Sequence, residues 1–315
     1  MSLAPDRTLG TTDLVVSPLC LGANVFGWTA NRDDSFAVLD AYVGEGGNFI
    51  DTADAYSAWV PGNSGGESET ILGEWMAARG NRDRIILATK GGKLHADLSV
   101  SAAGLRKALE QSLQRLGTDH VDLYYAHHDD LNVPQEETLG ILDTFVREGK
   151  VRYIGASNFD GPRLASALEI ARTNGLVPYA VLQNHYNLME REPYESTIAP
   201  IVAEHGMELL PYYSLARGFL TGKYRGGVTI DSPRAKGVEP YLNERGDRVL
   251  DVLSWLAGER GVTMAEIALA WLLAKPTVGA ALASARNLEQ FSGIDDVTVS
   301  LDADAIAALD AASAQ

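Results

Sequence analysis

The 315-residue sequence has one cysteine, Cys20, and few basic residues. A single cysteine excludes an internal disulfide and is typical of a reducing compartment. Acidic residues outnumber basic ones, 42 to 26, and the formal net charge of −16 argues against nucleic acid or an anionic membrane as the main partner. The first residues, MSLAPDRTLG, lack the apolar run of a signal peptide, and the longest apolar helical candidate, AEIALAWLLAK, is too short to span a bilayer. We therefore expect a soluble, cytoplasmic protein.

Apolar residues make up 46% of the chain, enough for a large core. Short β-rich runs alternate with amphipathic helical runs, which predicts parallel strands joined by helical crossovers. The predicted strands are LCLGA, NFIDTA, RIILATK, VDLYYAH, VRYIGAS, AVLQNHY, MELLPYY and VGAALAS. Eight such units predict a closed (β/α)₈ TIM barrel of the α/β class. An open doubly wound sheet is disfavoured, because its usual G-x-G-x-x-G fingerprint is absent.

No low-complexity or Pro-rich segment divides the chain, so we expect residues 1–315 to form a single barrel domain. Residues 7–17, RTLGTTDLVVS, predict an N-terminal β-hairpin that covers the barrel bottom. Two long loops, residues 57–67 and 222–244, are predicted at the carboxyl-terminal mouth, where long loops usually carry function.

Four polar side chains fall at or just beyond the ends of successive predicted strands. They are Asp51, Tyr56, Lys90 and His127. Each alone also fits a structural role, as a loop cap, a packed phenol, a solvated terminus or a satisfied imidazole. In a barrel, however, all four meet at one mouth. We expect Lys90 to lower the pKa of the Tyr56 phenol and Asp51 to keep Lys90 charged. Such a phenol suits proton donation to an oxygen that is becoming an alkoxide, which implies a separate hydride donor.

The segments FIDTADAY, LATK, DLYYAHHDD, IGASNF, LQNHYNL and PYYSLARGFLTGKY resemble those of the aldo-keto reductases, in order and over nearly the whole chain. The resemblance implies reduction of an aldehyde or ketone by NADPH, with NADH possible, and a cofactor extended across the mouth. It assigns Asp51, Tyr56, Lys90 and His127 as the catalytic tetrad, with Tyr56 as general acid and His127 sharing a hydrogen bond to the substrate oxygen. The expected partner is a small-molecule carbonyl compound.

The same resemblance implies the cofactor contacts. Ser157, Asn158 and Gln183 would bind the nicotinamide carboxamide, and Tyr212 would stack on its ring. Lys223 and Arg234 would contact the phosphates, and Ser284, Arg286 and Gln290 the 2′-phosphate and adenine. The other expected contacts are Gly22, Ala23, Asn24, Tyr213, Ser214, Leu215, Ala216 and Gly218. Trp28 and Trp59 are expected to line the substrate pocket, and no metal is expected.

The chain departs from the resembling family at three places. Gly293 and Ile294 stand where the family often has Glu-Asn, which removes expected adenine contacts. Residues 57–65 are inserted after Tyr56, and His185 stands where many relatives have Glu. Three alternatives remain open: a metal-dependent barrel hydrolase that uses HHDD, an NAD-linked sugar or alcohol dehydrogenase that uses the same tetrad, and a weakly catalytic cofactor-binding subunit like the potassium-channel β subunits. The sequence does not determine the oligomeric state.

Overall fold

The computed structural model describes residues 3–4, 7–95, 99–225, 230 and 235–314. Eight parallel strands form one sheet in the order β10-β3-β4-β5-β6-β7-β8-β9. Their bounds are β3 Leu19–Gly22, β4 Phe49–Asp51, β5 Ile86–Gly91, β6 Val121–Ala126, β7 Val151–Ser157, β8 Val181–Gln183, β9 Glu208–Leu209 and β10 Ala281–Ala283. The backbone N–H of Leu209 donates to Thr277 O at 2.7 Å, and that of Gly279 donates to Leu209 O at 3.0 Å. These bonds join β9 to the segment before β10, so the sheet curls into the predicted (β/α)₈ barrel.

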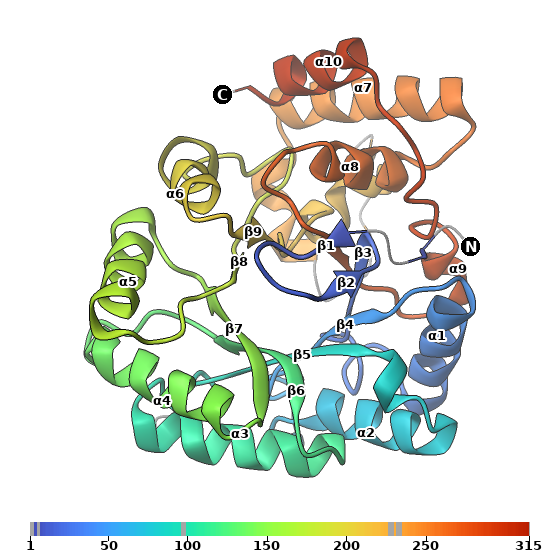
Figure 1. Ribbon diagram of the computed structural model, residues 1–315. Coiled ribbons are helices and arrows are strands. Elements are labelled where there is room, and N and C mark those ends of the chain that lie inside the picture. The colour runs from blue at the N-terminus through green and yellow to red at the C-terminus, as the bar shows by residue number, and fades with distance from the viewer. Residues whose placement is uncertain (1–2, 5–6, 96–98, 226–229, 231–234, 315) are drawn as a thin grey trace.

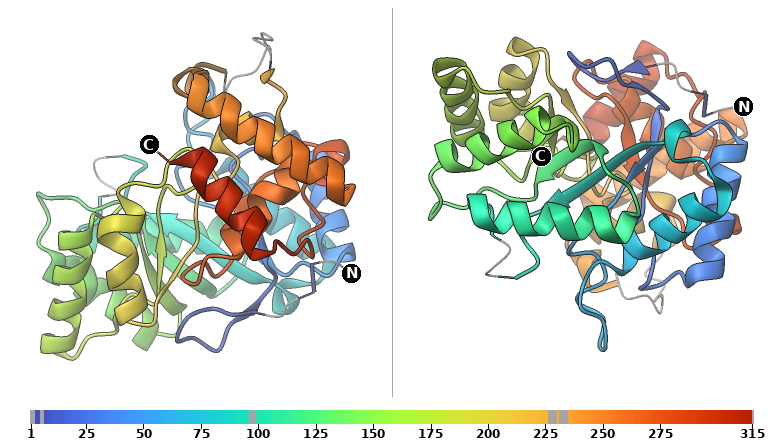
Figure 2. Two further views of the ribbon diagram at one scale, coloured as in Figure 1. Left: turned by 90° about the horizontal axis from the view of Figure 1, so that it is seen from above. Right: turned by 60° about the horizontal axis from the view of Figure 1, so that its bottom comes forward.

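Helices surround the sheet (Figure 1). Their bounds are α1 Arg32–Gly44, α2 Glu67–Arg79, α3 Ala102–Leu116, α4 Gln135–Arg147, α5 Gly161–Asn174, α6 Ala199–Glu204, α7 Glu244–Arg260, α8 Met264–Leu273, α9 Leu288–Phe291 and α10 Ala303–Ser313. Shorter turns are η1 Arg82–Arg84, η3 Tyr194–Ile198, η4 Ala216–Thr221, η6 Ala235–Gly237 and η7 Glu239–Tyr241. Helix α10 packs against α7 outside the ring (Figure 2, left). No helix in the described ranges is long and apolar enough to cross a membrane.

The strands are apolar because both of their faces are covered, one by helices and the other by the barrel interior. All six residues of β6 are buried, for example. Phe49, Leu123 and Val181 belong to a compact cluster in the interior. Leu9, Leu14 and Val16, which come from the N-terminal segment, belong to the same cluster. The N-terminal segment therefore plugs one end of the barrel.

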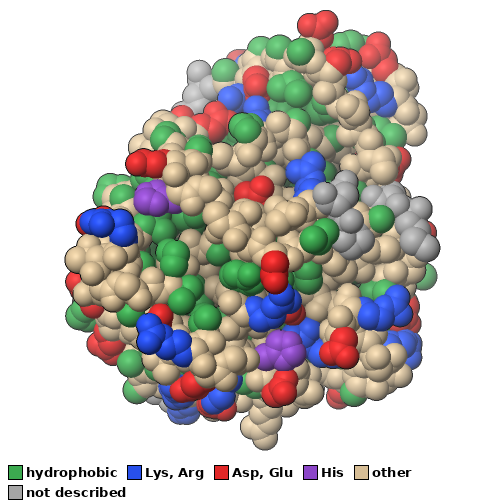
Figure 3. Space-filling model, viewed as in Figure 1, with side chains coloured by type: hydrophobic (Ala, Val, Ile, Leu, Met, Phe, Trp, Pro, Cys, Tyr) green, Lys and Arg blue, Asp and Glu red, His purple; other side chains and the backbone are tan. Residues whose placement is uncertain are grey.

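That segment is an antiparallel hairpin of β1, Arg7–Thr8, and β2, Val15–Val16, as predicted. It is tied to the first residues of the barrel strands: Asp13 pairs with Arg152 at 2.8 Å, and the Gly10 N–H donates to Glu208 at 2.9 Å. Basic and acidic side chains are interspersed over this face of the molecule (Figure 3). The hairpin covers the amino-terminal end, and the long loop after β4 projects from the other side (Figure 2, right). The hairpin does not cover the carboxyl-terminal end of the barrel, so that end can hold a functional site.

Candidate active site

The polar residues predicted to act together lie at the carboxyl-terminal ends of five neighbouring strands. Asp51 ends β4, Lys90 is one residue from the end of β5, and His127 follows β6. Ser157 ends β7 and Gln183 ends β8, and these two are register partners. In a (β/α)₈ barrel this end is where functional groups converge. The structure therefore brings the strand-end residues to one mouth.

Lys90 is the centre of a buried hydrogen-bond network. Its ammonium group donates to Asp51 Oδ1 at 2.5 Å, to the carbonyl oxygen of Thr52 at 2.7 Å and to the Tyr56 hydroxyl oxygen at 3.0 Å. An ammonium has three donors, and all three are used. The amide of Gln183 donates to the other Asp51 oxygen at 2.9 Å. Lys90 is thus held as a buried cation against one carboxylate and one phenol.

The pKa of Tyr56 differs from the sequence-based expectation. Burial raises it well above its ordinary value, and the nearby Asp51 carboxylate raises it further. The expected net lowering of this pKa is wrong for the structure described here, although the Lys90 ammonium still favours the phenolate. The reason is that Asp51, at salt-bridge distance, balances the Lys90 charge, so burial of the phenol outweighs it. Tyr56 therefore stays protonated over the physiological pH range.

His127 lies beside Tyr56, with the two ring centroids 6.2 Å apart. Burial lowers the pKa of His127 well below its ordinary value, and the charges of Lys90 and Lys93 lower it further. The imidazole is consequently neutral at pH 7, with one donor and one acceptor nitrogen. A neutral imidazole next to a protonated phenol offers two hydrogen-bonding groups to a single substrate oxygen.

The inserted loop after Tyr56 is pinned to the segment that follows β3. The Ser57 hydroxyl donates to Phe26 O at 2.8 Å, and the Asn63 amide donates to Gly27 O at 3.0 Å. These bonds place the Trp59 ring edge-to-face against Trp28, at a centroid distance of 5.4 Å, and 6.4 Å from the Tyr56 ring. The insertion thus builds an aromatic wall next to the phenol.

The amide of Asn158 is already engaged by the protein. Its nitrogen donates to His127 O and to Ser157 Oγ, both at 3.0 Å, and its oxygen accepts from the Tyr212 hydroxyl at 2.7 Å. Both amide hydrogens are therefore used, and one lone pair of the oxygen remains. On the far side of Tyr212, the His185 ring stacks at 5.3 Å with an interplanar angle of 14°. His185 thus fixes the plane of Tyr212, which gives this departure from the resembling family a structural role.

Backbone strain gathers at the same mouth. Within the described ranges, the non-glycine residues with positive φ are Ser57, Asn158, Tyr213, Ala216 and Arg217. Ser57, Asn158 and Tyr213 lie in loops after β4, β7 and β9, and Ala216 and Arg217 begin η4, which also follows β9. Such conformations cost about 1–3 kcal/mol each and are typical of ligand-binding and catalytic sites.

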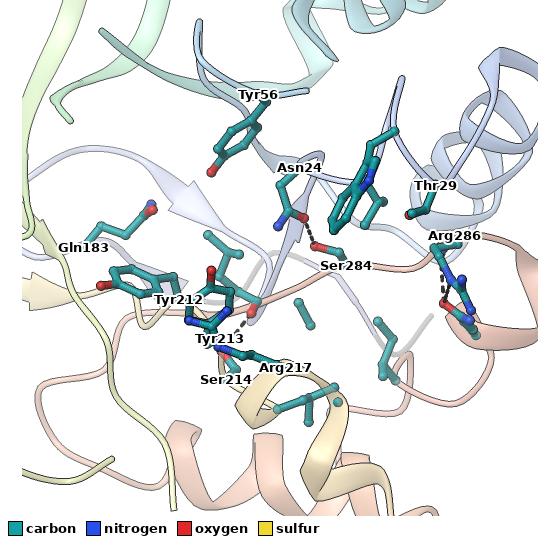
Figure 4. A pocket seen from close by; sticks show the side chains of 18 of the residues that line it. Asn24, Thr29, Tyr56, Gln183, Tyr212, Tyr213, Ser214, Arg217, Ser284 and Arg286 are labelled. Carbon is teal, nitrogen blue, oxygen red and sulfur yellow. Dashed lines mark hydrogen bonds between the residues drawn. The ribbon is translucent and has the colours of Figure 1, made fainter. Parts of the chain in front are cut away.

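A cavity of about 860 Å³ runs from the strand ends to the segment after β10. Figure 4 shows its span, with Gln183 and Tyr212 at one end, Arg286 at the other, and the Tyr56 hydroxyl pointing into the space between. At the Arg286 end, Ser284 donates to Asn24 at 2.6 Å, and Arg286 Nε donates to Gln290 at 3.3 Å. A methyl group on Gly22 would come within 2.8 Å of the Ser284 hydroxyl, which explains the glycine.

Most of the predicted residues line this cavity. They are Asn24, Trp28, Tyr56, Trp59, His127, Ser157, Asn158, Gln183, Tyr212, Tyr213, Ser214, Leu215, Gly218, Lys223, Ser284, Arg286 and Gln290. Gly22, Ala23 and Ala216 do not line it and lie behind it, as do Asp51 and Lys90. Arg234 lies outside the described residues. The lining also includes two cationic residues that were not predicted from the sequence as site residues, Lys93 and Arg217.

The sequence contained a signal for Arg217 as a cofactor contact, because this residue stands between the predicted contacts Ala216 and Gly218. Its guanidinium lies 4.2 Å from the centre of the Tyr213 ring, an arrangement that keeps it oriented along the cavity wall. Together with Lys223 and Arg286, and apart from Lys93, it gives the wall three cations in a protein of net charge −16. This donor set fits a ligand with a phosphate chain. In the described parts of the chain, no three His, Cys, Asp or Glu side chains converge in a way that could hold a metal ion.

Asp54 is a buried acid beside this network. Neither of its carboxylate oxygens has a hydrogen-bond partner in the described structure. Burial and the neighbouring Glu69 raise its pKa to about 7. In the unfolded chain the same group titrates near ~3.9, so the unfolded state releases its proton at a lower pH than the folded state. The buried Asp54 therefore does not lower the free energy of unfolding below about pH 4. Its destabilising effect grows as the pH rises and is complete above about pH 7.

We expect Asp54→Asn to remove this pH dependence. Relative to wild type, the variant should gain free energy of unfolding between pH 5 and pH 8, by at most about 3 kcal/mol, since about two pKa units of the shift titrate in this range at roughly 1.4 kcal/mol per unit. Urea unfolding at both pH values measures the gain. The control is Asp33→Asn, whose side chain is 94% exposed and should show no such gain. An equal stability difference at pH 5 and pH 8 would contradict the burial argument.

Comparison with known proteins agrees with the geometry. A model of the aldo/keto reductase family matches residues 18–314. An uncharacterized oxidoreductase of Bacillus subtilis, YrpG, is 36% identical over 306 residues, covering 93% of this chain and 91% of its own. Norsolorinic acid reductase B of Aspergillus parasiticus is 35% identical over 299 residues, covering 89% and 76%. Protein tas of Escherichia coli is 30% identical over 334 residues, covering 95% of each chain. With a barrel whose strand ends carry an acid, a lysine and a histidine, the chain belongs to the aldo/keto reductase family of oxidoreductases.

Proposed function

We propose that the protein reduces an aldehyde or ketone to an alcohol, with NADPH as hydride donor and Tyr56 as general acid. The observation that carries the proposal is the Tyr56 hydroxyl in the cavity, 3.0 Å from the buried ammonium group of Lys90. As negative charge develops on the substrate oxygen, Tyr56 donates its proton to it. The Lys90 ammonium then stabilises the phenolate that remains, and neutral His127 donates a hydrogen bond to the same oxygen.

The nicotinamide cofactor supplies the hydride when bound. On this proposal the Tyr212 ring and the strand-end polar groups Ser157, Asn158 and Gln183 hold the nicotinamide. Arg217 and Lys223 contact the diphosphate, and Ser284, Arg286 and Gln290 hold the adenosine end. Asn158 has limited capacity left, so we assign most of the carboxamide recognition to Ser157 and Gln183.

The alternative of an NAD-linked dehydrogenase would use the same tetrad, with Tyr56 as base. Burial keeps the Tyr56 phenol protonated in the free protein, which is the form from which reduction starts. A weakly catalytic binding subunit is disfavoured by the complete acid–lysine–tyrosine network. The names of the relatives point the same way, since several are norsolorinic acid reductases. The direct test is NADPH oxidation by the purified protein with a panel of aldehydes and ketones.

Coenzyme preference gives a second test. Arg286 offers two parallel donors to a 2′-phosphate, and a charge-assisted hydrogen bond contributes about 1.5–3 kcal/mol. We therefore expect NADPH to bind roughly 10- to 100-fold more tightly than NADH, and Arg286→Ala to weaken NADPH by that factor while leaving NADH nearly unchanged. Fluorescence titration of both coenzymes measures this. The control is Arg172→Ala, an arginine on the outer face of α5 that is 73% exposed and pairs with Glu169. Equal losses for both coenzymes would reject the assignment.

A further inference from the structure

The end of the cavity beyond Tyr56 is formed by the loops after β4 and β5 and by His127, which follows β6. The loop residues that line it are Ala58, Trp59, Lys93 and Leu94. The cofactor contacts proposed above lie on the strand ends, on the segment after β9 and on the segment after β10. The Lys93 end is therefore available to the substrate, and its side chains determine which carbonyl compounds fit.

Lys93 is exposed, and within the described parts of the chain no hydrogen bond or ion pair joins its ammonium group to another residue. The carboxylates of the adjacent loop, Asp129 and Asp130, are engaged by Arg163 at 2.6 Å and by the Asn132 N–H at 2.9 Å, and neither lines the cavity.

The acidic residue that lines the described cavity wall is Glu289, in α9 next to Gln290. It lies at the Arg286 end, away from Tyr56. Lys93 contributes instead to lowering the pKa of both His127 and His128, while Asp129 and Asp130 act in the opposite direction on His128. Neither of those two acids lines the cavity, whereas Lys93 does.

The other side chains at this end are aromatic or apolar. Trp59 is 52% exposed and makes an edge-to-face contact with Trp28, so part of its ring is open to a ligand. Leu94 and Ala58 complete the wall. A planar apolar body can lie against these rings while its carbonyl group reaches Tyr56.

We propose that Lys93 makes the site selective for carbonyl substrates that carry an anionic group, a carboxylate or a phosphate, on a planar apolar body. This inference rests on the proposed function. Lys93 is a specificity residue: it contacts the anionic group and takes no part in proton transfer. Because the contact is partly solvent-exposed, we expect it to contribute about tenfold in kcat/KM, mostly through KM.

The test compares 4-formylbenzoate with its uncharged analogue 4-formylbenzamide, with NADPH, in the full-length protein. For wild type we expect a kcat/KM ratio of about ten in favour of the carboxylate, which narrows as salt is raised. Lys93→Met should bring the ratio close to one, and Lys93→Arg should retain most of it. The ratio cancels any effect of Lys93 on His127, because that effect is common to both substrates. Lys150→Met, which removes a lysine paired with Glu110 at the other end of the barrel, should leave the ratio unchanged.

A second pair, 4-formylphenyl phosphate and 4-methoxybenzaldehyde, distinguishes phosphate from carboxylate. If wild type prefers the charged aldehyde in only one of the two pairs, that pair identifies the anionic group that the site selects. A ratio near one for both pairs in wild type, or a preference that survives Lys93→Met, overturns the inference while the proposed function stands. If none of these aldehydes and no other carbonyl compound is reduced with either coenzyme, the proposed function fails and the inference fails with it.

Discussion

Tyr56→Phe is expected to lower the turnover number for carbonyl reduction by about 10²–10⁴-fold, the usual contribution of a general acid. The substitution removes one oxygen atom and leaves the ring, so the packing against Trp59 is retained. Lys90 keeps its bonds to Asp51 and Thr52, and the strand ends stay in place. The loss should therefore fall on kcat, with little change in coenzyme affinity. Steady-state kinetics and a coenzyme titration separate the two quantities.

The matched control is Tyr153→Phe. The hydroxyl of Tyr153 lies at the amino-terminal end of the barrel, 3.0 Å from Asp13, far along the strand from the mouth. This variant should retain wild-type turnover. If Tyr56→Phe kept most of the carbonyl reduction, another group would have to supply the proton, and the proposed role of Tyr56 would be wrong.

Lys90→Met should damage both stability and catalysis. It leaves the Asp51 carboxylate buried without its cation, and removal of one partner of a buried ion pair typically costs about 3–5 kcal/mol. Turnover should fall by about 10²-fold or more, because the phenolate formed on proton transfer loses its stabilising charge. Loss of the ammonium also disfavours the phenolate in the free enzyme, so the alkaline limb of the pH–rate profile should move to higher pH.

The double variant Asp51→Asn/Lys90→Met separates these effects. It removes both charges, so most of the lost free energy of unfolding should return, while turnover should stay low. Urea unfolding and steady-state kinetics measure the two outcomes. Recovery of activity together with stability would show that Lys90 only supports the fold, which would contradict its proposed part in proton transfer.

Much of the fold could be predicted because its pattern is local. Each barrel strand is a short apolar run, and a parallel strand buried on both faces must be apolar. The runs that end in Asp51 and Lys90 could therefore be recognised, since charged residues are almost never fully buried unless they are paired. The alternation of these runs with amphipathic helices predicted the barrel, and the barrel itself brings strand ends to one mouth.

Other features of the site depend on contacts that no local pattern contains. Nothing in FIDTADAY shows that Asp51 balances the charge of Lys90 so closely that burial governs the pKa of Tyr56. The engagement of Asn158 by His127 and Tyr212, and the stacking of His185 behind Tyr212, join segments that are 27 to 54 residues apart. Lys93 and Arg217 are ordinary surface cations in the sequence, and become notable only where they line the cavity.

The sequence by itself determined which side chains stand at the ends of the strands, because strand period, apolar runs and barrel closure follow from backbone geometry and burial. The tertiary structure alone decided the protonation of Tyr56 and His127, the hydrogen-bonding capacity left to Asn158, and the position of Lys93 on the cavity wall. Those properties depend on desolvation and on distances between groups brought together by folding, and both are set only when the strands, loops and helices are packed.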